Sequence, residues 1–366
     1  MMGTRMSAFA ILLLCAAAIS AHAAERIHVI HCTDLYHPHE DLDDHFDLGA
    51  MYAVGQIDLK AIILDKGERQ QRCPGRIPMR QMNTITGHDV PCYIGLSQNL
   101  ATPQDKVLED KPEFQEGVDA ILKVLRDSPT PVGIVTLGSC RDIAAAFNRD
   151  PDLLRKKIGK LMIFIGEADA SKQDYREYNV NLDRNAFIRI MRSGLAVYWV
   201  PCFDGGVFKN NGHASYWVAR HEDLLARCRL PLIQYFIYAV DRKDASKIDP
   251  IQFLSAQPAA AEQKRLMSLN RNLWCAAVFT NLAGMQIVRQ DGRWQAVPID
   301  SRTDARPVFG FREVEVHVSD DAAISYRKTD TSRKVMRFEV LDRQNYPAAM
   351  TAVTAELLSG LGQPNK

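Results

Sequence analysis

Two neighbouring segments near the N-terminus decide the fold: Ile27-His-Val-Ile-His-Cys-Thr-Asp34 and Asp43-Asp-His-Phe-Asp-Leu-Gly-Ala-Met51. The first segment is rich in β-branched and apolar residues, which predicts a buried strand over Ile27–His31. The second opens an amphipathic stretch from Asp44 to Val54 with helical periodicity. A strand followed by a helix in this way is a βα unit, and such units build a mostly parallel sheet.

The same alternation continues outward from these segments. Further strands are predicted at Lys60–Leu64, Val132–Thr136, Lys160–Phe164 and Ala196–Pro201. Further helices are predicted at Glu116–Arg126, Ile143–Phe147, Asn185–Arg192 and Leu266–Leu282. From Val288 the pattern indicates a hairpin turn at Gln290-Asp-Gly-Arg293, strands around Val314 and Phe338, and a closing helix over Ala348–Leu361. The sequence therefore predicts one α/β domain over residues 24–366, with helices flanking a mostly parallel sheet and a small C-terminal β annex.

The first residues have the features of a secretory signal peptide. Arg5 precedes an apolar run from Ala8 to Ile19, and the small residues Ala21 and Ala23 follow it. We expect residues 1–23 to be removed and the mature protein to be periplasmic or secreted. No later stretch approaches the roughly 20 apolar residues that a membrane-spanning helix needs, so the mature chain is not expected to enter a membrane.

The overall charge is close to neutral, with 45 basic and 44 acidic residues. No general field would therefore draw the chain to nucleic acid or to an anionic membrane, and neither is an expected partner. The oligomeric state stays open, and a homo-oligomer is compatible with the sequence. Removal of the leader leaves an odd number of cysteines without CxxC spacing, which argues against a zinc site or a dense disulfide framework.

Acidic side chains crowd the segment between the first strand and its helix. Asp34 follows the strand, and Glu40, Asp41, Asp43 and Asp44 come before the helix is established. Open α/β sheets bind ligands at the carboxyl ends of their strands, and several carboxylates together favour a hard cation, calcium first. A solvated acidic loop that caps the helix explains the segment equally well by itself. The nearby histidines suggest a transition metal only weakly, because their spacing lacks the geometry of a helical zinc pair.

The motifs resemble those of the inosine-uridine-preferring nucleoside hydrolases along nearly the whole mature chain. Asp34 with Asp43-Asp44 resembles the opening aspartate motif of that family, although His37–Asp41 is additional to it. The later segments that carry the resemblance are Val135-Thr-Leu-Gly-Ser-Cys-Arg-Asp-Ile143, Ile163-Phe-Ile-Gly-Glu167, Glu177-Tyr-Asn-Val-Asn-Leu-Asp183 and Asn270-Arg-Asn-Leu-Trp-Cys-Ala-Ala277.

The resemblance implies calcium-dependent hydrolysis of the N-glycosidic bond of a ribonucleoside or a related N-riboside. By position, Asp34 would be a calcium ligand and the base that accepts a proton from the attacking water. Asp44 and the backbone carbonyl of Leu137 would be further calcium ligands, and Asp43 would accept a ribose hydroxyl. Glu177 and Asn179 would hold the sugar hydroxyls. The alternative is a non-catalytic relative that binds calcium or sugar on the same fold.

Three positions depart from the family pattern. Glu68 falls where the family has an asparagine near the ribose, which implies a substrate-binding role. Asn272 falls where the family has the last metal-binding aspartate, and it can still bind calcium through its carbonyl oxygen, although the site loses one negative charge. Arg271 takes the place of a histidine that can protonate the departing base. Arginine gives up a proton far less readily than imidazole, so this replacement predicts a preference for leaving groups that depart as anions.

Overall fold

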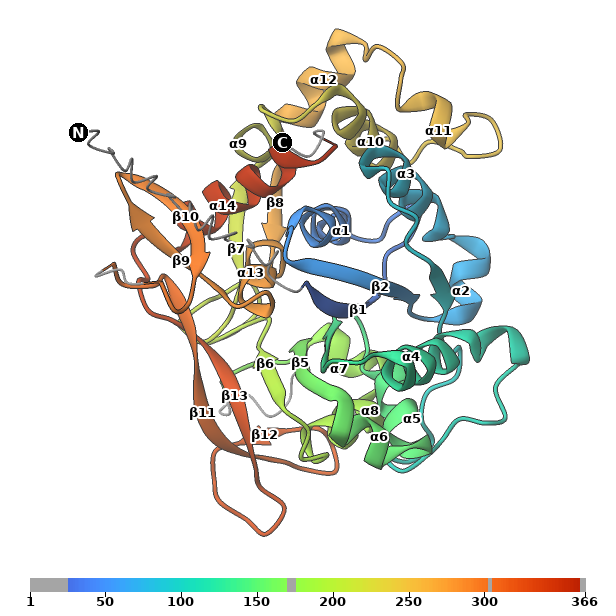
Figure 1. The fold of residues 1–366 in the computed structure, drawn as a ribbon, viewed down its shortest axis with the longest axis vertical. Helices are drawn as coiled ribbons and strands as arrows, with labels where there is room; N and C mark the ends of the chain where they lie inside the picture. Colours follow the sequence, from blue (N-terminus) through green and yellow to red (C-terminus); the bar gives the residue numbers. More distant parts are fainter. Residues whose placement is uncertain (1–25, 170–175, 302–304, 363–366) are drawn as a thin grey trace, which may run out of the picture.

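A mixed sheet forms the centre of the molecule (Figure 1). The computed structural model describes residues 26–169, 176–301 and 305–362. Over these residues the strand order is β12-β11-β13-β6-β5-β4-β1-β2-β3. The strands are β1 Ile27–Thr33, β2 Ile57–Leu64, β3 Cys92–Ile94, β4 Val132–Thr136, β5 Ile158–Phe164, β6 Val197–Val200, β11 Phe309–Val318, β12 Ile324–Ser325 and β13 Arg333–Val340.

The strands from β13 to β3 pair in parallel, whereas β11 pairs antiparallel with β13 and β12. Because strand side chains alternate between faces, β1 sends Val29 into one apolar core and Ile30 into the other. A buried sheet with two apolar faces needs helices on both sides. The predicted α/β fold with a mostly parallel sheet is confirmed.

Helices cover both faces of the sheet, as Figure 1 shows. One face packs against α1 Asp43–Ala53, α3 Arg76–Thr86, α10 Leu230–Val240 and α14 Tyr346–Gly360. The other face packs against α4 Glu116–Asp127, α5 Arg141–Arg149 and α8 Arg184–Met191. The shorter helices are α2 Gly67–Arg72, α6 Pro151–Lys157, α7 Tyr178–Leu182, α9 His221–Leu225, α11 Pro250–Phe253, α12 Ala260–Met267 and α13 Phe279–Leu282.

The predicted helix over Leu266–Leu282 is wrong. The chain leaves α12 at Met267, forms the strand β8 Asn270–Leu273, and becomes helical again only beyond Cys275. Strand β8 pairs antiparallel with β7 Trp217–Arg220. This long-range partner offers the backbone of Asn270–Leu273 a ladder of hydrogen bonds, and that pairing overrides the weak helical periodicity of the segment.

The C-terminal part joins the main sheet. A hairpin of β9 Met285–Gln290 and β10 Arg293–Pro298 confirms the predicted turn, where Asp291 and Gly292 both have positive φ. The predicted strands around Val314 and Phe338 are β11 and β13, and β13 extends the parallel sheet beside β6. The closing helix α14 packs across β7, β9 and β10.

Three other features of the chain bear on the sequence predictions. No helix of the described residues is both long and apolar enough to cross a membrane. The cysteines at positions 32, 73, 92, 140, 202, 228 and 275 are all free thiols. The predicted signal peptide lies outside the described residues.

Candidate functional site

A cavity of about 390 Å³ opens at the carboxyl ends of the central strands. It forms there because β1, β4, β5 and β6 are neighbours in the sheet, so the loops that follow them meet at one edge. The lining residues are Asp34, Glu40, Asp41, Asp43, Asp44, Asp47, Leu137, Phe164, Glu177, Tyr178, Asn179, Cys202, Phe203, Val207, Phe208, Trp274 and Cys275.

The cavity brings together six of the residues that the sequence nominated. They are Asp34, Asp43, Asp44, Leu137, Glu177 and Asn179. The other three nominated residues, Glu68, Arg271 and Asn272, do not line it. The separation follows the fold: the six residues come from β1, α1, β4 and α7, whose ends converge at the cavity.

Four carboxyl groups form the acidic end of the cavity: Asp47 is buried, and Asp34, Asp43 and Asp44 are half-buried. Asp43 and Asp44 occupy the first turn of α1, and Asp47 lies one turn later, so all three face the same way as Asp34. Burial raises the pKa of Asp34 to about 7, and the nearby Asp65 carboxylate acts in the same direction. Burial and the neighbouring carboxylates also raise the pKa of Asp43 and Asp44 well above the usual range. Such a group of acids is stable only when protons or a cation neutralise it.

Asp47 is the most isolated member of this acidic end. It is 1% exposed, and neither carboxylate oxygen accepts a hydrogen bond of good geometry. Burial raises its pKa to about 8, although the Cys275 thiol and the Ala276 amide lie close enough to lower it in part. A buried carboxylate whose nearest donors are poorly aligned carries a large desolvation cost, and a positively charged or donating ligand would reduce that cost.

The chemistry of these donors fits a hard cation. Asp34 and Asp44 offer carboxylate oxygens and Leu137 offers a backbone carbonyl, the oxygen donors that calcium prefers. Over the described ranges, however, no three His, Cys, Asp or Glu side chains converge in the geometry of a metal site. The donor set and the unpartnered oxygens of Asp47 therefore support a cation here without fixing its position.

Helix α7 carries the predicted sugar-binding segment. Glu177 caps it: one carboxylate oxygen accepts from the backbone amide of Asn179 at 3.0 Å, and the other accepts from that of Gly166 at 2.9 Å. Burial raises the pKa of Glu177 to about 7, against the lowering effect of these amides. The side-chain amide of Asn179 donates to the carbonyls of Leu137 at 2.7 Å and Phe164 at 3.0 Å. These contacts fix α7 to the ends of β4 and β5.

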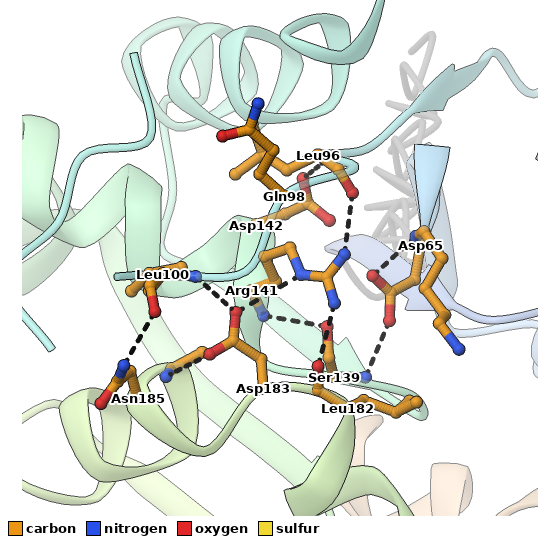
Figure 2. Close-up of polar contacts among 12 residues, drawn as sticks. Asp65, Leu96, Gln98, Leu100, Ser139, Arg141, Asp142, Leu182, Asp183 and Asn185 are labelled. Carbon is orange, nitrogen blue, oxygen red and sulfur yellow. Dashed lines mark hydrogen bonds and ion pairs between the residues drawn. The ribbon is translucent and has the colours of Figure 1, made fainter. Parts of the chain in front are cut away.

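A buried arginine supports α7 from behind (Figure 2). Arg141, 1% exposed, donates to the carbonyl of Leu182 at the end of α7 and to that of Leu96 beyond β3, both at 3.1 Å. Its Nε lies 3.4 Å from a carboxylate oxygen of Asp183, which also accepts from the Leu100 amide at 2.9 Å. Arg141 thereby joins the segment beyond β3 to the end of α7.

The additional segment His37–Asp41 is fastened at the mouth of the cavity. Glu40 accepts a hydrogen bond from the Tyr178 hydroxyl at 3.2 Å and forms an ion pair with Arg69. Asp41 forms an ion pair with Arg271 at 2.8 Å. The segment thus adds the carboxylates of Glu40 and Asp41 to the lining. Each of them forms an ion pair with a nearby arginine.

The three remaining predicted residues lie outside the cavity lining. Arg271 contacts Asp41 and also lies 3.4 Å from the His221 ring nitrogen. Asn272 accepts from the Tyr216 hydroxyl at 3.1 Å. Glu68 is exposed at the start of α2, 3.5 Å from the Lys111 ammonium group. Trp274 and Cys275, the two residues just beyond the end of β8, line the cavity instead.

Aromatic side chains form a second part of the cavity wall, the aromatic wall, which the sequence analysis did not predict. The ring centroids of Phe203 and Phe208 are 5.4 Å apart, and those of Phe203 and Trp274 are 5.9 Å apart. Tyr216 packs behind them at 5.5 Å from Trp274. These residues come from segments far apart in the chain, so no local pattern marks them. Only the position of Phe203 just beyond a predicted strand, Ala196–Pro201, gave a signal.

The molecule is an α/β protein with a mostly parallel sheet and a cavity lined by acidic and aromatic side chains at the strand ends, which is where such folds bind ligands. The chain belongs to the inosine-uridine preferring nucleoside hydrolase family, whose model matches residues 34–283. The family assignment agrees with the resemblance seen in the sequence.

Individual relatives are distant. The pyrimidine-specific ribonucleoside hydrolase RihA of Citrobacter koseri is 25% identical over 174 residues, which is 42% of this chain and 55% of that protein. RihA of Enterobacter sp. matches to the same extent. The chain therefore spans about half the length of these curated relatives.

Solved structures share the fold over nearly the whole chain. A plant nucleoside hydrolase, PpNRh1, has a TM-score of 0.51 at 16% identity and covers 91% of this chain and 99% of its own. The type III effector protein XopQ, solved with adenosine diphosphate ribose, has a TM-score of 0.53 at 15% identity and covers 92% and 95%. At these identities the similarity establishes the fold alone.

Proposed function

We propose that this protein hydrolyses the N-glycosidic bond of ribonucleosides or related N-ribosides and uses calcium to do so. The observation that carries the proposal is the convergence of Asp34, Asp43, Asp44, Glu177 and Asn179 on one cavity at the carboxyl ends of the sheet. These five polar side chains come from the end of β1, from α1 and from α7, and in a family of nucleoside hydrolases they supply acceptors for sugar hydroxyls and a proton acceptor for water.

Each side chain has a separate task in this proposal. Asp34, with its pKa raised to about 7, is poised to accept the proton of an attacking water near neutral pH. Asp43, Glu177 and Asn179 hold the ribose hydroxyls. The surrounding carboxylates stabilise the positive charge that develops on the sugar as the bond breaks. Asp34, Asp44 and the Leu137 carbonyl would hold calcium, which when bound orients the sugar hydroxyls and acidifies the water.

A non-catalytic relative that binds calcium or sugar is the alternative. It is favoured by the absence of any His, Lys or Arg from the lining formed by the described residues, because neutral nucleosides need a proton on the departing base. Whether the protein hydrolyses nucleosides distinguishes the enzyme from the non-catalytic relative.

The test uses the mature protein and a panel of nucleosides, with release of reducing sugar as the readout, in the presence of calcium or of a chelator. We expect calcium-dependent release that Asp34→Asn abolishes and that Asp152→Asn, a control at a carboxylate 96% exposed, leaves unchanged. If the parent protein and Asp152→Asn both bind the sugar but release no reducing sugar from any nucleoside, the non-catalytic alternative is established.

We also propose that the protein is exported. The proposal rests on the sequence of residues 1–23, and the mature N-terminus is expected at Ala24. Mass spectrometry of the protein recovered from the periplasm or medium checks it, and an intact N-terminus in a cytoplasmic fraction would contradict it.

A further inference from the structure

The charges of the cavity are strongly one-sided. Seven side chains of its lining are carboxylates, and no Lys, Arg or His belongs to the part of the lining that the structure describes. The nearby Arg69 and Arg271 are held outside by Glu40 and Asp41. Glu40 and Asp41 are already paired, and a bound divalent cation would offset only part of the negative charge that the other five carboxyl groups can carry. The cavity therefore attracts positive ligands and repels anions.

A second observation points to a ligand independently of this count. Both oxygens of Asp47 are buried in the cavity wall and accept no hydrogen bond of good geometry, as described above. An acid in that state gains from any cationic or donating group that enters the cavity. The acidic end is thus incomplete without a ligand, and it differs in this from a solvated acidic surface.

Two aromatic rings of the lining are exposed, and the Lys66 ammonium group lies 5.9 Å from the ring centroid of one of them, Tyr178. Phe208 is 53% exposed and Tyr178 is 51% exposed, which is unusual for large rings. Together with Phe203 and Trp274 they line the cavity. Aromatic faces attract cations by about 0.5–2 kcal/mol, more when water is excluded. A flat ring that carries positive charge would satisfy both walls at once.

We propose that the preferred substrates are N-ribosides whose departing ring is positively charged, such as pyridinium ribosides or purine ribosides alkylated on the ring. This inference rests on the proposed function. It names the substrate class of the same cavity and replaces the expectation, drawn from Arg271, that the leaving group departs as an anion.

The reaction of such a substrate balances without a general acid. The bond between the anomeric carbon and the ring nitrogen breaks, and its electron pair remains on the nitrogen and cancels the positive charge there. The ring leaves as a neutral molecule. The oxygen of the attacking water bonds to the anomeric carbon, and the proton of that water passes to Asp34. A neutral nucleoside instead needs a proton on its base, a contribution worth about 10²–10⁴ in rate.

The test compares turnover and binding in the intact mature protein. Hydrolysis of N-ribosylpyridinium, inosine and uridine is measured, with each rate divided by the uncatalysed rate of the same compound. After this normalisation, we expect kcat/KM for N-ribosylpyridinium to exceed kcat/KM for inosine and for uridine by at least about 100-fold. Calorimetry then compares two rings of the same shape, the N-methyl-meta-carbamoylpyridinium cation and uncharged meta-toluamide. The cation is expected to bind about 10-fold more tightly.

Paired variants locate the effect. Phe208→Leu is expected to reduce the preference for the charged ring, whereas Phe311→Leu, at a partly buried ring on β11 outside the cavity, is expected to retain it.

Cleavage of inosine or uridine at a normalised rate equal to or above that of N-ribosylpyridinium would overturn this inference and leave the proposed function in place. Hydrolysis of none of the three compounds would overturn the proposed function and the reaction step, and equal binding of the two rings would overturn the charge-selective cavity.

Discussion

The side-chain amide of Asn179 donates a hydrogen bond of 2.7 Å to the backbone carbonyl of Leu137. Its second donor bonds the Phe164 carbonyl at 3.0 Å. Both N–H groups of the amide are therefore committed to the ends of β4 and β5, and a ligand meets Asn179 through its remaining carbonyl oxygen. The residue predicted to hold sugar thus also positions the carbonyl predicted to hold calcium.

Asn179→Asp tests this double role. The substitution turns a donor into a carboxylate that faces two carbonyl oxygens, so we expect a loss of about 1–3 kcal/mol in the free energy of unfolding and a severe loss of turnover. Urea denaturation and kinetics measure the two effects. The control is Asn181→Asp on the same helix, where the side chain is exposed and the expected change is within about 0.5 kcal/mol. Equal effects of the two substitutions would remove the positioning role of Asn179.

Arg141 is expected to be the most sensitive residue beneath the cavity. Arg141→Met leaves the buried Asp183 without its cationic partner and frees the Leu96 and Leu182 carbonyls, which should cost about 3–5 kcal/mol of stability. Arg155→Met removes an exposed pair with Asp152 and should cost less than about 1 kcal/mol. Denaturant midpoints measure both.

A double-mutant cycle isolates the ion pair from its other contacts. If Arg141 and Asp183 are coupled, the double variant Arg141→Met with Asp183→Asn loses less stability than the sum of the single variants. Strict additivity would show that Arg141 acts through the loop carbonyls alone.

A pH dependence of stability is expected from Asp142, which accepts a hydrogen bond from the Leu96 amide at 2.8 Å. Burial, and then the Asp65 carboxylate, raise the pKa of Asp142 to about 7 in the folded protein. The folded state therefore holds a proton that the unfolded state releases near pH 4. Its contribution is complete below about pH 4 and is lost as the pH rises toward 7, on the order of 1 kcal/mol per pH unit.

Asp142→Asn checks this dependence, because the amide keeps the acceptor for Leu96 and cannot ionise. The variant should lose less stability than the parent protein between pH 4 and 7, as measured by thermal melts at several pH values. Asp152→Asn, which removes an exposed carboxylate, should leave the parent slope unchanged. Parallel slopes for all three proteins would contradict the assignment.

Much of the fold was predictable because its information is local. The strand β4 has the predicted bounds, Val132–Thr136, and β1 contains the predicted Ile27–His31, since continuous β-branched runs mark strands buried on both faces. Strand β7 was missed, and β8 was predicted as helix, because each is extended only through pairing with the other. Such pairing joins residues far apart in the chain, and local periodicity does not contain it.

The candidate site divides in the same way. Asp34 and the pair Asp43-Asp44 were predictable because they flank one βα connection. Trp274 and Cys275 line the cavity only because β8 ends at Leu273, which follows from the missed strand pairing. Phe208 reaches the cavity from a loop without regular structure. These residues owe their position to tertiary contacts.

Arg271 is expected to act through the mouth of the cavity. Its guanidinium group binds Asp41 at 2.8 Å and lies outside the lining, so Arg271→Ala should loosen the segment His37–Asp41 and raise KM roughly threefold. The factor should be the same for leaving groups of different acidity, as a series of substituted ribosides would measure. Arg220→Ala, at an exposed arginine on the neighbouring strand, is the control. A loss confined to anionic leaving groups would instead restore the role that the sequence suggested.

Calcium is expected to stabilise the folded protein. A cation that binds the acidic end neutralises carboxylates that burial otherwise holds at raised pKa, and it has no preformed site in the unfolded chain. At a concentration about 100 times its Kd, calcium should add about 2.7 kcal/mol to the free energy of unfolding. Thermal melts with calcium and with chelator measure this shift, and elemental analysis measures bound calcium.

Asp44→Asn should reduce the shift because it removes a donor, whereas Asp152→Asn, at an exposed carboxylate outside the lining, should retain it. Magnesium should be less effective, since it demands a smaller and more regular shell of oxygens. Identical melts in calcium and in chelator, with no calcium in the purified protein, would show that protons and the ligand itself neutralise the acidic end.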